Sequence, residues 1–202
     1  MNRIRRSLLA VLALAPLAAR AQQQQRGPYT ELNPPMPVES GNKIEVLEFF
    51  WYGCIHCYNL EPKIDIWLKK LPPDVEFRRV PAVLSDRWAR DASIFYTFDA
   101  LGLLDKLHRP FFDAIHRDRL RTDTWPQLSE WLEKQGVDTK KFDAAAKSFG
   151  VQSKTRRAIR LTTDYRIDGT PAMAVHGRYV VSAADNMLDT VNQLVAAIRK
   201  HK

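Results

Sequence analysis

The sequence lacks the marks of several common classes of protein. Only two of its 202 residues are cysteines and they form one C-x-x-C segment, so no second pair is present to complete a zinc site. Past residue 21 no apolar run is long enough to cross a bilayer, and no internal repeat is visible. Basic residues stand in scattered pairs such as Arg78-Arg79, which argues against nucleic-acid binding. With 45% hydrophobic and 27% charged residues, the composition is that of a soluble globular protein.

The first 21 residues differ from the rest of the chain. Three arginines precede the apolar run SLLAVLALAPLAA, and Ala19-Arg20-Ala21 follows as a small-x-small pattern. This order predicts a secretory signal peptide cleaved after Ala21. A transmembrane anchor is the alternative, but the run is well short of the roughly 20 residues that an anchor needs. The segment holds four of the 31 basic residues and no acid, so removing it halves the formal net charge of +8.

The next part of the chain predicts a strand, a helix and a strand. Residues 22–42 are rich in Gln, Pro and Gly and predict an extended lead-in, with at most a short strand near Tyr29–Leu32. The continuous apolar run KIEVLEFFWY (43–52) is typical of a strand buried on both faces. A helix with apolar residues at three-four spacing follows from Cys54, with a kink expected at Pro62. VEFRRVPAV (75–83) predicts a second strand, parallel to the first.

From residue 85 to 165 the apolar period is helical throughout. Helices are expected through Trp88–Leu104, at 105–118, after caps at Thr124 and Asp138, and from Ser153 onward, with Gly136 and Gly150 as stops. Two short strands around His176-Gly177 follow in 171–183, and an amphipathic helix closes the chain. The order predicts an α/β domain made of 43–84 and 166–202, with an all-helical domain, 85–165, inserted in it.

The cysteine pair lies in FFWYGCIHCYNLEP (49–62) and has three interpretations. A structural disulfide is poorly placed there, because closing so short a loop yields roughly 2 kcal/mol against about 4.7 for a loop of ~100 residues. A zinc site lacks further ligands. His108 and His116 have no metal-site spacing and are expected to be ordinary surface or interhelical histidines, and His176 a turn residue.

A redox-active pair explains the position of the cysteines. Cys54 comes where the helix begins, so its sulfur would face unpaired amides and the positive end of the helix dipole. His56 adds a donor and, when protonated, a positive charge nearby. We therefore expect the pKa of Cys54 to lie well below its usual value, with Cys57 as the less exposed resolving thiol. A stabilised thiolate is also a good leaving group, which makes the disulfide form an oxidant.

The motif EFFWYGCIHCYNLEP, together with IDGTPAMAVHGRY (167–179), resembles the DsbA-type thiol:disulfide oxidoreductases of the bacterial periplasm, in the thioredoxin superfamily. The resemblance extends from about Pro28 to the C-terminal helix. It implies an α/β thioredoxin fold (βαβ…ββα) with an inserted helical domain. It also implies a periplasmic dithiol oxidase that donates the Cys54–Cys57 disulfide to newly exported proteins. A quinone-linked membrane partner of the DsbB type would reoxidise the cysteine pair. No bound cofactor, metal or nucleic acid is implied, and a monomer is favoured.

The resemblance also assigns roles to four further residues, and the helical spacing of Glu61, seven residues after Cys54, suggests a role for a fifth. Pro171 matches the cis-proline beside the cysteines, with a trans turn proline as the alternative, and Thr170 would present its backbone to substrate. Glu48 matches a buried acid that helps to move protons from the resolving thiol, with Arg79 on the neighbouring strand as its partner. A purely structural ion pair is the other interpretation. Glu61 would tune the thiolate, and a solvated glutamate is an equal alternative.

Three positions depart from the family pattern. Ile55 stands where proline is typical, Thr170 replaces a valine, and Pro62 is a feature of thioredoxin. The first two affect redox poise, so they leave open how strong an oxidant the pair is. Two rival functions therefore remain: a disulfide isomerase or reductase of the same fold, and a non-catalytic binding or holdase module with an inert disulfide.

Overall fold

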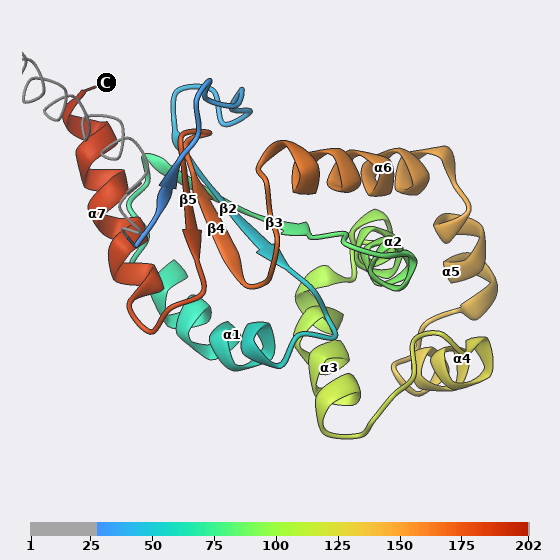
Figure 1. Ribbon diagram of the computed structural model, residues 1–202. Helices are drawn as coiled ribbons and strands as arrows, with labels where there is room; N and C mark the ends of the chain where they lie inside the picture. Colours follow the sequence, from blue (N-terminus) through green and yellow to red (C-terminus); the bar gives the residue numbers. More distant parts are fainter. Residues whose placement is uncertain (1–27, 202) are drawn as a thin grey trace, which may run out of the picture.

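The computed structural model describes residues 28–201, in which five strands form one sheet with helices packed around it (Figure 1). The predicted signal peptide, residues 1–21, lies outside this range. The strands are β1 (Thr30–Glu31), β2 (Ile44–Phe50), β3 (Val75–Pro81), β4 (Ala172–Val175) and β5 (Tyr179–Ser182). The helices are α1 (Ile55–Leu68), α2 (Asp86–Ala100), α3 (Leu104–His116), α4 (Trp125–Lys134), α5 (Thr139–Ala146), α6 (Phe149–Asp164) and α7 (Met187–Lys200).

The sheet has the order β1-β5-β4-β2-β3, with β2 parallel to β3 and antiparallel to β4. All seven residues of β2 are buried, as the continuous apolar run predicts for a central strand. Ile44 and Val46 face a cluster formed with α1 and α7, whereas Leu47 and Phe49 face α6. Because side chains alternate along a strand, Glu48 shares the face of Ile44 and Val46. A buried carboxylate is thus placed beneath α1.

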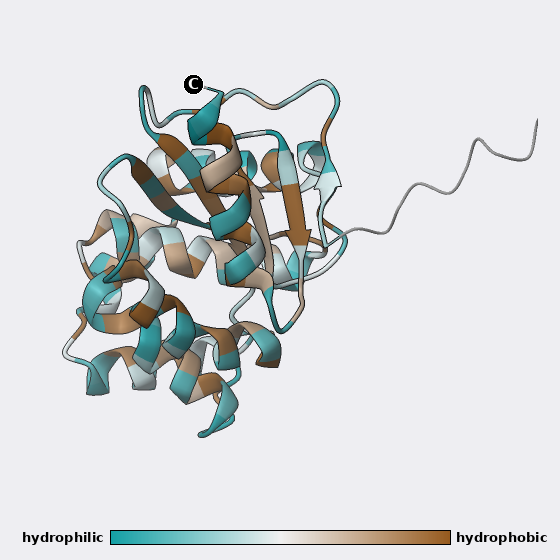
Figure 2. Cartoon of the chain, turned by 90° about the vertical axis from the view of Figure 1, so that its left-hand side faces the viewer, coloured by the Kyte–Doolittle hydropathy of each residue, from teal (hydrophilic) through white to brown (hydrophobic). Residues whose placement is uncertain are grey.

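Helices α2–α6, which we call the helical insert, lie together at one side of the sheet, opposite α7 (Figure 1). An aromatic-rich core including Phe95, Phe98, Phe111 and Phe112 holds α2–α5 together, and it also includes Cys57 from α1. Polar and apolar residues alternate along these helices, as expected for helices with one buried face (Figure 2). Element order and sheet topology confirm the predicted α/β fold with a helical insertion.

The start of α6 corrects the sequence analysis. Ser148 caps this helix by accepting from the Val151 amide at 3.3 Å, so the helix begins at Phe149 and contains both Gly150 and Ser153. Gly150 does not stop a helix because it occupies the first turn, where amide groups need no partner within the helix. Gly136 does end α4, with a φ of +76°. Helix α1 likewise runs on through Pro62 to Leu68.

Strands β4 and β5 form the predicted hairpin. His176 and Gly177 turn the chain with φ of +49° and +67°, and the Arg178 amide donates to the Val175 carbonyl at 3.0 Å. A side chain at Gly177 would lie 2.0 Å from the Met36 carbonyl oxygen, so only glycine fits. The turn thereby holds the lead-in against the sheet. Within residues 28–201, no helix has the length and apolar character of a membrane span.

Candidate active site

Helix α1 begins at the first cysteine. Cys54 is the N-cap residue, with φ −87° and ψ 114°, and its sulfur accepts from the Cys57 amide at 3.4 Å. A cap residue usually offers an oxygen to this amide, and here the sulfur takes that place. The positive end of the helix dipole lies at the same point. A negative charge on the Cys54 sulfur is therefore favoured.

Hydrogen-bond donors lower the pKa of Cys54. The hydrogen bond from the Cys57 side chain is the main reason that this pKa falls from 9.0 to about 5, against the opposing effect of partial burial. The Thr170 side chain and the amides of Cys57 and His56 act in the same direction. The Thr170 carbonyl, 3.2 Å from the sulfur, instead accepts from the thiol form and opposes them. The donors prevail, so Cys54 is a thiolate at neutral pH.

His56 and Ile55 lie between the cysteines at the surface. Both side chains are exposed, Ile55 to 48%. From the sequence we expected the imidazole of His56 to act on Cys54. In the structure the backbone amide of His56 contributes to the lowered pKa of Cys54. An exposed apolar Ile55 next to a reactive sulfur offers a contact to an approaching chain.

Cys57 lies one helical turn further in and has no exposed surface. It packs in the aromatic cluster that includes Phe50, Tyr52 and Phe112. Burial, together with the hydrogen bond to Cys54, raises the pKa of Cys57 far above its usual range. Cys57 therefore remains a thiol when Cys54 is ionised, and it donates its proton to the Cys54 sulfur. Both cysteines are free in this structure.

Pro171 lies opposite the cysteines, directly before β4. The Thr170–Pro171 peptide bond is cis, which confirms the prediction and makes the trans interpretation wrong. Pro171 itself is buried, and the Thr170 carbonyl contacts the Cys54 sulfur. The reactive sulfur and the backbone expected to bind substrate are therefore side by side.

A groove of about 590 Å³ opens between α1, Pro171 and the start of α7. It is lined by His56, Asn59, Leu60, Lys63, Pro171, Ala183, Ala184, Asp185, Met187, Leu188 and Asp189. The lining is mixed, with Lys63 and two aspartates among the apolar residues. Backbone contacts and the apolar part can hold chains of varied sequence, while the charges allow some selection.

The second part of the site is a charged cluster beneath α1. Glu48 on β2 pairs in register with Arg79 on β3, and Arg79 Nε lies 3.2 Å from a Glu48 oxygen. The N–H groups of Arg79 are directed at Glu61, at 2.9 and 3.4 Å, so neither Glu48 oxygen has a hydrogen-bond partner among the described residues. Burial, and then the charge of Glu61, raise the pKa of Glu48 from 4.5 to about 8. Glu48 therefore carries a proton at neutral pH.

The position of Glu61 rules out one of its two predicted alternatives. Its side chain is 2% exposed and paired with Arg79, so the solvated interpretation is wrong. Glu61 follows Cys57 by four residues on the buried face of α1, and so belongs beneath Cys57 rather than beside Cys54. Any influence of Glu61 on the thiols passes through the charged cluster.

One feature that the sequence did not reveal is the set of contacts made by the two histidines of α3. His108 of α3 is buried and contacts Glu61, so it is interhelical but not at the surface. A histidine between Leu107 and Phe111 in an apolar stripe was the signal for this contact. His116 Nε2 donates to the Tyr52 backbone carbonyl at 2.8 Å, so this nitrogen carries the proton. Among residues 28–201 no group of three or more potential metal ligands lies together.

Gly53 is the other missed feature. A side-chain carbon at this position would lie 2.3 Å from the Trp51 ring. That ring is held by a stack on Trp88, with centroids 4.4 Å apart, and by a hydrogen bond from its Nε1 to Asp91 at 2.7 Å. The loop before Cys54 therefore requires glycine, because the ring is not free to move aside.

The fold and site together define a class: a thioredoxin-like protein with an activated C-x-x-C pair and a helical insert. A model of the DSBA-like thioredoxin domain matches residues 75–195. The thiol:disulfide interchange protein DsbA of Bordetella parapertussis is 42% identical over 202 residues, covering 96% of each chain. That of Azotobacter vinelandii is 44% identical over 151 residues, covering 75% of this chain and 71% of the relative.

A solved structure agrees with these matches. The crystal structure of Pseudomonas aeruginosa DsbA has a TM-score of 0.81 and 35% sequence identity to this chain, and the match covers 86% of this chain and 93% of that one. The chain belongs to the DSBA-like thioredoxin family of thiol:disulfide oxidoreductases.

Proposed function

We propose that this protein is a dithiol oxidase that donates the Cys54–Cys57 disulfide to newly exported proteins. The observation that carries the proposal is the set of donors around Cys54, which lower its pKa from 9.0 to about 5. Stabilising the thiolate stabilises the reduced protein, so the disulfide form is the stronger oxidant.

The reaction consists of two exchanges. A substrate thiolate attacks the Cys54 sulfur, the Cys54–Cys57 bond breaks, and Cys57 leaves with the electron pair. A second substrate thiolate then attacks the substrate sulfur of the mixed disulfide, and Cys54 leaves as a thiolate. The substrate loses two electrons and two protons. The enzyme gains the two electrons and binds one proton at Cys57, and the other proton passes to solvent because Cys54 remains a thiolate.

The surrounding residues have distinct proposed roles. Thr170 and Pro171 bind the substrate backbone next to Cys54, as an added strand does at a sheet edge. Glu48, protonated at neutral pH and close enough to Cys57 to affect its pKa, supplies the proton that the leaving Cys57 thiolate takes up. The Ile55–His56 dipeptide adjusts the redox poise at the surface.

The proposed site of action is the periplasm, which the predicted N-terminal signal peptide supports. The substrates are unfolded or partly folded exported proteins with free thiols. By resemblance to the family, a quinone-linked membrane oxidase of the DsbB type restores the disulfide, and the protein acts as a monomer.

The equilibrium reduction potential against glutathione tests the direction of the reaction. We expect a potential well above that of thioredoxin, about −270 mV, because the Cys54 thiolate is stabilised. A potential near the thioredoxin value would make the protein a reductase. Inert cysteines, with no exchange with glutathione at all, would instead support a binding or holdase module. The thiolate absorbance of the reduced protein should confirm a Cys54 pKa near 5 in the same samples.

A further inference from the structure

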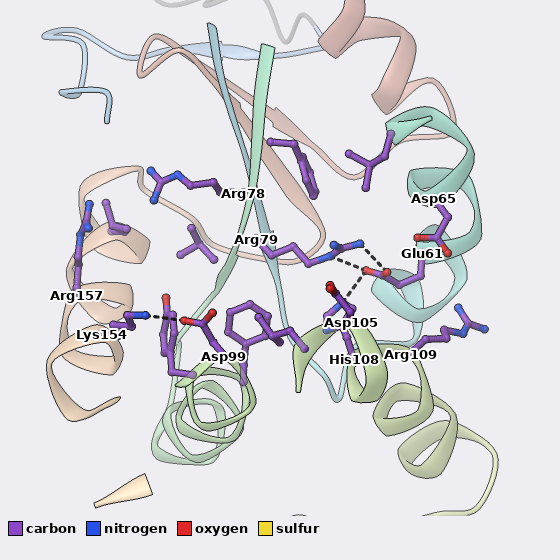
Figure 3. Close-up of a pocket in the computed structure, with 17 residues that line it drawn as sticks. Glu61, Asp65, Arg78, Arg79, Asp99, Asp105, His108, Arg109, Lys154 and Arg157 are labelled. Atoms are coloured by element: carbon purple, nitrogen blue, oxygen red, sulfur yellow. Dashed lines mark hydrogen bonds and ion pairs between the residues drawn. The ribbon is translucent and has the colours of Figure 1, made fainter. Parts of the chain in front are cut away.

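The charged cluster beneath Cys57 extends into the helical insert. His108 of α3 places its Nε2 3.3 Å from a Glu61 oxygen and its Nδ1 2.9 Å from the Tyr52 hydroxyl. Figure 3 shows the contacts that Glu61 makes with Arg79 on one side and with His108 on the other. Glu61 is thus held by β3 and by the insert at once.

The two contacts of His108 specify its tautomer. A carboxylate only accepts, so Nε2 carries the proton that is donated to Glu61. Nδ1 is then free to accept from the Tyr52 hydroxyl. This neutral form agrees with burial, which lowers the pKa of His108 in spite of the opposing charge of Glu61. His108 thus acts as a fixed N–H donor at neutral pH.

The donor matters for the charge of Glu61. Burial alone would raise the pKa of this carboxyl, and the hydrogen bond from His108 together with Arg79 lowers it below its usual value. An ionised Glu61 repels a second charge on Glu48 and draws the N–H groups of Arg79 to itself. The consequence is a protonated Glu48 with no hydrogen-bond partner of its own among the described residues.

A groove of about 640 Å³ joins this cluster to solvent (Figure 3). Arg79, Glu61 and His108 line it, although their side chains are only 19%, 2% and 11% exposed. The titratable and charged groups around His108 come from the segment after β2, from α1, β3 and α3: Tyr52, Glu61, Asp65, Arg79, Asp105 and Arg109. Solvent in the groove contacts Arg79, Glu61 and His108 but not Glu48, so a proton that returns to Glu48 from the groove passes by way of these side chains.

We propose that His108 is a positioning residue for thiol:disulfide exchange: its Nε2–H keeps Glu61 ionised and paired with Arg79, which keeps Glu48 protonated as the proton donor for Cys57. When the Cys57 thiolate is released, the proton passes from Glu48 to that sulfur, and Glu48 regains one from water. The helical insert thereby sets the protonation of the acid beneath the cysteines. The proposal rests on the function proposed above.

The test measures the pKa of Glu48 directly, by the carboxyl ¹³C shift of glutamate-labelled protein, with Glu48→Gln to assign the signal. His108→Leu removes the donor. Glu61 then becomes easier to protonate and Arg79 is released to Glu48, so we expect the pKa of Glu48 to fall by about one unit or more. His108→Gln, which keeps an N–H donor, should hold it near the wild-type value.

Two further variants separate this role from a structural one. Glu61→Gln should lower the pKa of Glu48 in the same direction, and adding His108→Leu to it should change little more, because both act through one charge. An unchanged or raised Glu48 pKa in His108→Leu overturns the proposal. An equally large fall of the Glu48 pKa in His108→Gln overturns it as well. These titrations are independent of oxidase activity, so failure of the wild type to oxidise a dithiol peptide would refute the proposed function alone.

Discussion

The two ends of the first turn of α1 have different chemical surroundings. The outer end, at Cys54, is made of backbone amides and the Thr170 residue, and it holds a negative charge near solvent. The inner end, at Cys57, is apolar and rests above a buried group of ionisable side chains. One turn of helix therefore separates a site that favours a thiolate from one that excludes it. This contrast lets the pair release a substrate at Cys54 while Cys57 takes up a proton.

The outer and inner regions also depend on different numbers of helices and strands. The outer region needs the helix start, Thr170 before β4, and the Trp51 ring that supports the loop before Cys54. The inner region needs β2, β3, α1 and α3, each of which supplies one ionisable group. Substitutions at Cys54 and Thr170 should therefore change mainly the reactivity of the thiols. Substitutions in the inner region should also lower the free energy of unfolding.

The largest effect is expected from Cys54→Ser, which should abolish oxidation of a dithiol peptide because a hydroxyl forms no disulfide. Cys57→Ser is the matched control: its Cys54 thiolate can attack oxidised glutathione and release one glutathione thiolate. The resulting mixed disulfide should accumulate, detectable by mass, because no Cys57 thiol is present to displace it. If peptide oxidation persisted in Cys54→Ser, the two thiols would have been assigned the wrong roles.

Arg79→Leu should be the most destabilising change at the inner end. It leaves Glu48 and Glu61 buried without their shared cation, which should lower the free energy of unfolding by about 3 kcal/mol. Urea unfolding of the oxidised protein measures this loss. The comparison variant is Arg199→Leu, which breaks an exposed ion pair with Asp74 and should cost much less. Equal losses in the two variants would show that the inner cluster is not specially dependent on Arg79.

The stability of the reduced protein should depend on pH in a way that the oxidised protein does not share. The pKa of Cys54 is about 5 when folded and 9.0 in its ordinary state, so the unfolded chain binds the proton more tightly. The stabilisation is complete above about pH 9 and is lost as the pH falls through 5. The free energy of unfolding of the reduced and oxidised forms, measured from pH 4 to pH 8 (~4 units), tests this. The reduced form should gain stability relative to the oxidised form as the pH rises. A difference that does not change with pH would contradict the depressed pKa.

Gly53→Ala tests the support of the outer region. The added carbon would meet the Trp51 ring at 2.3 Å, so the ring must leave its stack on Trp88. We expect a cost of about 1–3 kcal/mol and a change in tryptophan fluorescence. Gly169→Ala is a suitable control because nothing lies within 4 Å of its added carbon. Similar behaviour of both variants would count against a role for the ring in supporting the loop.

Thr170→Val should have the smallest effect. It keeps the backbone carbonyl at Cys54 but removes the side-chain donor that lowers the pKa of that thiol. The pKa should therefore rise by a fraction of a unit, and the disulfide should become a slightly weaker oxidant. The thiolate absorbance against pH measures this change. A fall in the pKa would show that the Thr170 hydroxyl does not stabilise the Cys54 thiolate.

Much of the molecule could be predicted because the signals are local. The apolar run at 43–52 predicted the central strand, and residues 171–183 predicted the hairpin. The pairing of Glu48 with Arg79 was implied by the family resemblance, and the register of β2 with β3 agrees with it. The start of α6 was misplaced because Ser148 and Ser153 are both reasonable caps, and glycine is tolerated in a first turn. Local preference does not distinguish two such candidates.

The sequence by itself determined the reactive pair and where it lies: Cys54 and Cys57 at a helix start, before a threonine and proline that face them. Only the tertiary structure decided the state of the acids beneath. Glu61 and His108 are 47 residues apart, and their contact exists because α3 packs against α1. Protonation depends on burial and on charges brought from several elements, which no pattern along the chain records.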